Sequence, residues 1–144
     1  MAVGYTQLSN LELAGLVLLR RLTCRMPFQQ AIVVEPEPLI GLLSTVMAPR
    51  FCEFVLELKK LPSKYSLPSS EDWSRWIQID QFLDERFAGN RSFKVIIRTS
   101  RPHDRVLFQR QAKCGFPLLA KRKCVHFEVS DDIGVRLFFY PILP

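Results

Sequence analysis

The sequence is poor in glycine and lacks the short motifs by which the common catalytic folds are recognised. Only six of its 144 residues are glycine, and neither of the phosphate-binding patterns G-x-G-x-x-G and G-x-x-x-x-G-K occurs. The G-x-S-x-G turn that presents a catalytic serine is also missing. These absences argue against nucleotide-dependent enzymes and serine hydrolases. We therefore expect a protein that is not an enzyme and that uses no cofactor.

Cysteine and histidine are too few and too scattered to predict a metal site. The cysteines form no C-x-x-C pair, and neither His103 nor His126 is near paired cysteines. Since His126 falls inside an expected strand, we expect no catalytic role for it. We expect all the thiols to be reduced, which is their usual state in the cytosol or nucleus. The cysteines are Cys24, Cys52, Cys114 and Cys124.

The longest apolar run near the N-terminus, residues 13–19, does not predict export or a membrane span. It follows Glu12, whereas a signal peptide has a positively charged leading segment. It is also shorter than the roughly 20 apolar residues that cross a bilayer. We expect a cytoplasmic or nuclear protein without a membrane partner.

The chain is basic, with a formal net charge of +6 and a pI near 9.4. Nucleic-acid-binding proteins usually concentrate positive charge on one element and place exposed aromatic residues within it. Here the basic residues are spread along the chain and most aromatic residues occupy expected core positions, so we do not expect a nucleic-acid partner. A basic nucleic-acid-binding domain stays open as an alternative, and it would use Arg98, Arg101, Arg105, Arg110 and Lys121–Lys123.

Length and an apolar content of 48% predict one globular domain over residues 1–144, or the terminal fragment of a larger repeat domain. Strand-like and helix-like patterns alternate from Phe51 onward, which predicts parallel strands joined by crossover helices. We expect strands at 31–34, 51–58, 93–98 and 125–129, helices at 39–47, 70–88 and 104–114, and a further helical turn at 117–120.

The helix expected at 70–88 has apolar residues at helical spacing on one face. Trp73 and Trp76 belong to that face, so we expect them in the core rather than at an interface. The acidic residues Asp80, Asp84 and Glu85 are interleaved with Arg75 and Arg86. This pattern predicts ion pairs within the helix on a solvated face, and no metal site.

One segment fits the skeleton of a leucine-rich repeat, with leucines at 8, 11, 13 and 16. The final position carries Leu16 where that repeat normally has Asn or Cys. The expected strand starts at 51, 93 and 125 are spaced more widely than the roughly 20 to 29 residues of ordinary repeats. The fold expected is α/β, an irregular leucine-rich-repeat-like open sheet of mostly parallel strands with helices packed on it. A small three-layer α/β sheet is the alternative.

Four blocks of sequence carry a resemblance to a known family. In this order they resemble the C-terminal, leucine-rich-repeat-like region of the F-box domain-containing proteins of mushroom-forming fungi, over about residues 30–130. In that family the F-box docks onto a ubiquitin-ligase scaffold and the following repeats bind a client. No helical F-box precedes the region in this chain, so we expect no contact with the ligase scaffold. The blocks are 39–44 with 48–58, 73–80 with 83–87, 93–99, and 116–120 with 125–128.

These observations predict a non-enzymatic protein-interaction module, the client-facing part of an F-box and leucine-rich-repeat ubiquitin-ligase adaptor, with an unknown protein client. A truncated gene-family product without independent function is a further alternative. The tail 131–144 is strongly apolar and either adds a final strand at the sheet edge or leaves an exposed apolar patch. The expected partner-facing residues alternate with inward-facing ones along the strands and are Glu53, Val55, Glu57, Lys94, Ile96, Arg98, His126 and Glu128.

Overall fold

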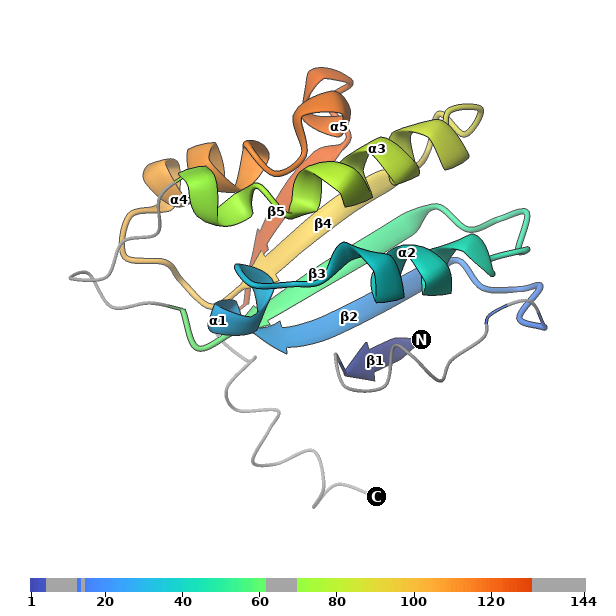
Figure 1. The fold of residues 1–144 in the computed structure, drawn as a ribbon, viewed down its shortest axis with the longest axis horizontal. Coiled ribbons are helices and arrows are strands. Elements are labelled where there is room, and N and C mark those ends of the chain that lie inside the picture. The colour runs from blue at the N-terminus through green and yellow to red at the C-terminus, as the bar shows by residue number, and fades with distance from the viewer. Residues whose placement is uncertain (5–12, 14, 62–69, 131–144) are drawn as a thin grey trace, which may run out of the picture.

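The computed structural model describes residues 1–4, 13, 15–61 and 70–130. Its strands form one open, all-parallel, five-stranded sheet in the order β1-β2-β3-β4-β5 (Figure 1). Each strand therefore pairs with its neighbour in sequence. The strands are β1 (Ala2–Gly4), β2 (Arg21–Pro27), β3 (Glu53–Lys59), β4 (Lys94–Thr99) and β5 (Val125–Val129).

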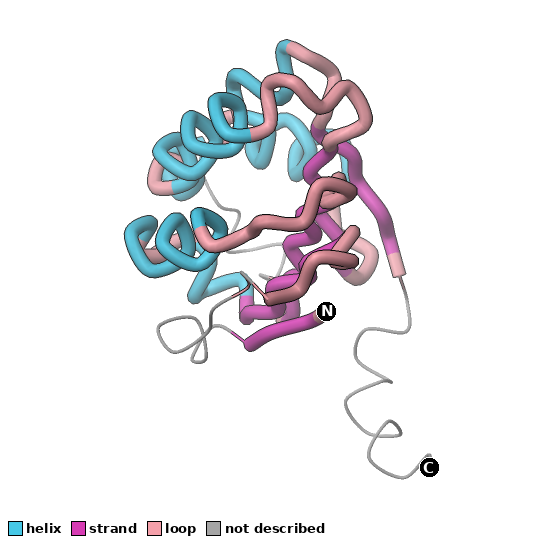
Figure 2. The backbone as a smooth tube through the Cα atoms, turned by 90° about the vertical axis from the view of Figure 1, so that its right-hand side faces the viewer, coloured by secondary structure: helices cyan, strands magenta, loops and turns pink. Residues whose placement is uncertain are grey.

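The described helices lie together on one face of the sheet, so the architecture has two layers (Figure 2). The reason is topological. Right-handed crossovers that always step to the next strand place every helix on the same side, and only a reversal of strand order would put helices on both. The described chain thus forms the open-sheet fold, and not the three-layer alternative. The helices are α1 (Phe28–Ala31), α2 (Pro36–Ser44), the 3-10 helix η2 (Ser70–Trp73), α3 (Trp76–Arg86), α4 (Arg105–Lys113) and α5 (Pro117–Lys121).

The strands expected at 51–58, 93–98 and 125–129 are present as β3, β4 and β5, within one or two residues of the expected bounds. The strand expected at 31–34 is wrong. The N–H groups of Ile32 and Val33 donate to the carbonyls of Phe28 and Gln30, at 3.2 and 3.3 Å, so this segment is the end of a helical turn. Pro36 then opens α2.

The structure bears on two further expectations, the helix at 70–88 and the leucine-rich-repeat segment. The single helix expected at 70–88 is divided into η2 and α3. In the proposed repeat segment, Leu8 and Leu11 lie outside the described residues, and so does the tail 131–144 with its expected edge strand. Leu13 is buried but outside any strand, and Leu16 is 41% exposed.

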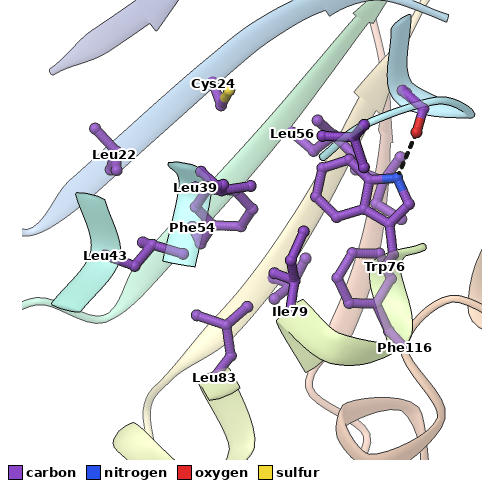
Figure 3. Close-up of a cluster of buried hydrophobic side chains, with 14 of the residues drawn as sticks. Leu22, Cys24, Leu39, Leu43, Phe54, Leu56, Trp76, Ile79, Leu83 and Phe116 are labelled. Carbon is purple, nitrogen blue, oxygen red and sulfur yellow. Dashed lines mark hydrogen bonds between the residues drawn. The ribbon is translucent and has the colours of Figure 1, made fainter. Parts of the chain in front are cut away.

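The core lies between the sheet and the helices and combines aliphatic side chains with aromatic ones, such as Phe54, Trp76 and Phe116 (Figure 3). Trp73 and Trp76 are both fully buried, as the helical spacing predicted. The indole N–H of Trp76 donates to the carbonyl of Ala31 at 2.9 Å, which satisfies its polar atom. Trp73 makes edge contacts with Phe28 and Phe108, at 6.1 Å between ring centroids in each case. Aromatic packing thereby joins α1, η2 and α4.

Replacement of Trp76 by alanine should remove both a large buried surface and a buried hydrogen bond. We expect Trp76→Ala to lower the free energy of unfolding by about 3 to 5 kcal/mol, measured by urea denaturation. Gln78→Ala, at an exposed position of the same helix, should change it by less than about 0.5 kcal/mol. Near-normal stability of Trp76→Ala would contradict the central place of this side chain in the core.

Glycine-to-alanine substitutions at two positions should have opposite effects. A Cβ at Gly115 would lie 2.9 Å from the carbonyl oxygen of Trp73 and 3.1 Å from the Cβ of Trp76. A Cβ at Gly41, inside α2, would meet nothing within 4 Å. We expect Gly115→Ala to lower the melting temperature, and Gly41→Ala to raise it through the roughly 0.5 to 1 kcal/mol of helix propensity. Equal effects of the two substitutions in thermal melts would contradict this account.

Candidate functional site

The second face of the sheet carries the residues that the sequence assigned to a partner. Alternation along each strand sends one set of side chains into the core and the other to the opposite side. We call this opposite side the uncovered face, because no described helix lies on it (Figure 2). The register aligns Glu53 with Lys94, Val55 with Ile96 and Glu57 with Arg98. It also places His126 beside Ile96 and Glu128 beside Arg98. All the predicted site residues therefore lie on one face.

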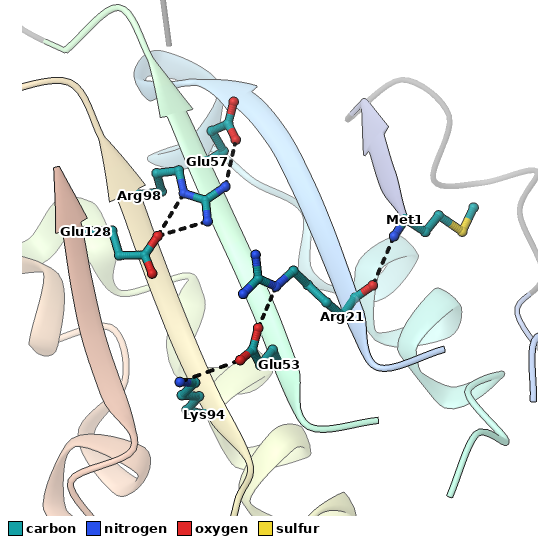
Figure 4. Close-up of polar contacts among 7 residues, drawn as sticks. All are labelled: Met1, Arg21, Glu53, Glu57, Lys94, Arg98 and Glu128. Carbon is teal, nitrogen blue, oxygen red and sulfur yellow. Dashed lines mark hydrogen bonds and ion pairs between the residues drawn. The ribbon is translucent and has the colours of Figure 1, made fainter. Parts of the chain in front are cut away.

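A row of alternating charge crosses the uncovered face from β2 to β5, and Figure 4 shows it from Glu57 to Glu128. We call it the long row, and its members in order are Arg25, Glu57, Arg98 and Glu128. Glu57 is only 2% exposed, with Arg25 Nε at 3.3 Å on one side and Arg98 Nη1 at 3.5 Å on the other. Arg98 also donates from Nη2 and Nε to one oxygen of Glu128, at 2.8 and 3.0 Å. A buried carboxylate between two guanidinium groups is the kind of buried charge that proteins tolerate.

A second, short row of charge runs parallel to the first and consists of Arg21, Glu53 and Lys94. The Glu53 carboxylate accepts a hydrogen bond from Arg21 Nε and has Lys94 Nζ at 3.5 Å (Figure 4). Burial pushes the pKa of Glu53 upward, but the hydrogen bond and charge of Arg21 and the charge of Lys94 outweigh it. The pKa of Glu53 consequently lies below its ordinary value.

Between the two charged rows lies a central row of smaller and apolar side chains, formed by Thr23, Val55, Ile96 and His126. Val55 and Ile96 are 0% and 2% exposed although they do not belong to the core between sheet and helices. His126 is exposed at the β5 end of the row. The apolar centre is therefore not accessible to a partner, and the accessible side chains of the uncovered face are His126 and members of the two charged rows, such as Arg21 and Glu128.

Three of these face residues come from β2, which the sequence analysis did not predict. Arg21, Thr23 and Arg25 pair with Glu53, Val55 and Glu57 of β3. The signal was present, because Leu22, Cys24 and Met26 alternate with them and are buried. Arg21, Thr23 and Arg25 at the alternate positions complete the pattern of a half-buried strand, which the sequence analysis overlooked.

The acidic residues of α3 do not form the solvated, helix-internal ion pairs that the sequence suggested. Asp80 is fully buried, and its carboxylate accepts hydrogen bonds from the N–H groups of Leu118 and Leu119 at 2.9 and 3.0 Å. Asp84 pairs with Arg122 at 2.6 Å, beyond its own helix. Burial raises the pKa of Asp80 against the effect of these backbone hydrogen bonds. Asp80 is therefore a structural group that holds the start of α5 against α3.

The arginines expected to pair with these acids also contact other segments. Arg86 donates to the carbonyl of Val46 at 2.8 Å, and Arg75 lies 3.5 Å from the carbonyls of Val33 and Val34. They tie α3 to the segments that flank α2. The expected pairing within the helix is wrong because neighbouring segments of the helix layer offer closer partners.

The basic residues of the nucleic-acid alternative do not gather in one place. Arg98 lies on the uncovered face in contact with two glutamates. Arg101 and Arg105 follow the end of β4, whereas Lys121–Lys123 precede the start of β5. Because neighbouring strands are parallel, the end of one and the start of the next lie at opposite edges of the sheet.

The four cysteines are not paired with one another. Burial raises the pKa of the Cys24 thiol to about 12, so this thiol is protonated at neutral pH and is a poor nucleophile and metal ligand. The described residues contain no group of three or more His, Cys, Asp or Glu side chains placed to hold a metal ion.

No protein-family model, curated protein or solved structure matches this chain. In the described part of the chain, no helix has the length and apolar character needed to span a bilayer. The fold and the uncovered face are therefore the observations from which a function must be argued.

The stabilising effect of Glu53 should depend on pH. Its pKa is lowered on folding, so the stabilisation is present above the ordinary value of 4.5 and is lost as the pH falls through the lower folded value. We expect Glu53→Gln to lower the free energy of unfolding by roughly 0.5 to 1 kcal/mol at about pH 7. The difference from the wild type should shrink toward about pH 3, because the wild-type side chain is then neutral too. Urea denaturation at both pH values checks this.

The control variant is Glu85→Gln, at an exposed position of α3, and its difference from the wild type should show no such trend with pH. A pH-independent difference for Glu53→Gln would contradict the ion-pair account.

Proposed function

We propose that this chain is a non-enzymatic protein-interaction module that binds a protein client through the uncovered face. The observation that carries the proposal is that an all-parallel sheet has helices on one face only in the described part of the chain. Parallel sheets are usually covered on both faces. An ordered, uncovered face on such a sheet is a natural place for a partner.

The topology supports the same proposal. Parallel strands that pair in sequence order, with all helices on one side, are also the arrangement of repeat proteins such as the leucine-rich repeats. Those proteins bind partners on an extended surface. In line with the resemblance of its sequence, we place the chain among client-binding parts of F-box and leucine-rich-repeat adaptors.

The charge pattern of the uncovered face favours a protein over a nucleic acid. Its two charged rows contain Arg21, Arg25, Lys94 and Arg98 against Glu53, Glu57 and Glu128, and neighbouring charges of opposite sign form ion pairs. Such a face creates little net field, whereas phosphate backbones are bound by surfaces of uniform positive charge. A protein surface with mixed charge is the complementary partner.

The proposal is tested by site-specific photo-crosslinking in cells. A crosslinking amino acid at His126, which is exposed on the uncovered face, should capture a discrete protein partner, and one at Gln81, exposed on α3, should not. The double reversal Lys94→Glu with Glu128→Lys leaves the net charge unchanged and should abolish the capture at His126. The matched reversal Glu85→Lys with Arg105→Glu, at exposed positions of the helix layer, should leave it intact. Equal capture at both positions, or loss of capture in the helix-layer reversal alone, would refute binding through this face.

A further inference from the structure

A cleft lies at the edge of the sheet where β2, β3 and β4 begin, and the central row of the uncovered face contributes no residue to it. It is a depression open to solvent, with a volume of about 630 Å³. Its lining combines residues of the segments that precede the three strands, namely Arg20, Pro49, Arg50, Cys52, Gly89, Asn90, Arg91 and Ser92.

The lining of this cleft has positive charge without any negative charge. Three of its residues are arginines and none is acidic. Arg20, Arg50 and Arg91 are all exposed, and none of them forms an ion pair with another described residue. The acidic residue that follows directly, Glu53, is already in contact with Arg21 and Lys94. The guanidinium groups in the cleft therefore lack a counter-charge among the described residues.

Hydrogen bonds fix the backbone around the cleft. The N–H groups of Cys52 and Glu53 both donate to the carbonyl of Arg20, at 2.9 and 3.1 Å. The Asn90 side chain donates to the carbonyl of Phe51 at 3.0 Å and accepts from the Ser92 N–H at 2.9 Å. The segments that bear the arginines are thereby joined before any ligand arrives, which lowers the entropic cost of binding.

We propose that this cleft binds a small molecule carrying two linked phosphate groups. Guanidinium groups bind phosphate oxygens in pairs through charge-assisted hydrogen bonds, and several of them together match the charge of a diphosphate. The Ser92 hydroxyl, also exposed in the lining, adds a neutral donor. This site is independent of the client-binding function proposed for the uncovered face.

The same arginines have one competing role. The crossover helices α2 and α3 run back toward this edge, so their C-terminal ends, with partial negative charge, lie on the same side of the molecule as the cleft. Cations there would stabilise the helices without binding any ligand. The two roles differ in one measurable respect, which is whether the arginines contribute to the binding of pyrophosphate.

The test is isothermal titration calorimetry of the full chain with pyrophosphate, in a phosphate-free buffer of fixed ionic strength. We expect the double substitution Arg50→Gln with Arg91→Gln to weaken binding at least roughly tenfold, since each removes a charged donor. The control Arg105→Gln with Arg110→Gln removes the same charge from exposed positions of α4 and should change the affinity by less than about twofold. Thermal melts of both variants without pyrophosphate report their folding.

Four results would overturn the proposal. One is the absence of pyrophosphate binding by the wild type. A second is equal weakening in the cleft and control variants, which would show a general effect of charge. The third is binding of a single-stranded oligonucleotide by the cleft arginines without binding of pyrophosphate, which would make the cleft part of a nucleic-acid surface. A loss of thermal stability in the cleft variant, with pyrophosphate affinity unchanged, would assign the arginines to the helix ends alone and count against the proposal.

Discussion

The pairing of each parallel strand with its neighbour in sequence is the constraint on which the rest of the structure depends. It places every described helix on one side, and the packing of those helices on the sheet around Trp76 then forms the core. It also leaves the opposite face of the sheet without a described helix. The described strand order has no reversal, so the described helices form no second layer, and this sheet has no switch point of the kind at which doubly wound α/β proteins bind their nucleotides. The candidate functional surfaces are consequently the sheet face itself and the edge where strands begin.

In a sheet covered on both faces, a second helix layer would order the side chains of this face. Here ion pairs between the charged residues of the uncovered face order them instead. Ion pairs extend across the face from strand to strand, and Glu57 is buried between two arginines. Removal of one partner from such a group leaves a buried charge without compensation, whereas the intact row is tolerated. The face is thus ordered by side-chain contacts of its own, and its central row of Val55 and Ile96 remains apolar beneath a charged border.

Apolar and β-branched runs made β3 and β4 predictable from the sequence, and strict alternation did so for β5. The face on which each predicted site residue lies followed from these strands. Prediction failed at two other segments. The alternation of β2 is regular but was overlooked, and the β-branched residues of 31–34 suggested a strand where the chain completes a helical turn. Asp80 was misplaced for a different reason. Its role depends on α5, whose backbone N–H groups are 38 and 39 residues away in sequence, and no local pattern reports such a contact. The arginine-lined cleft has no sequence signal for the same reason, because Arg20, Arg50 and Arg91 come from separate loops.

The sequence-ordered sheet has a consequence for how the chain acquires its structure. Each strand pairs with the strand before it in sequence, and the next strand covers its free edge. Because the strands are parallel, each of these pairings still joins distant parts of the chain: Leu22 pairs with Phe54, Phe54 with Val95, and Val95 with Val125. Each pairing must therefore close a long crossover before its contacts form, so the assembly of the sheet, and not the formation of the helices, should limit the rate of folding.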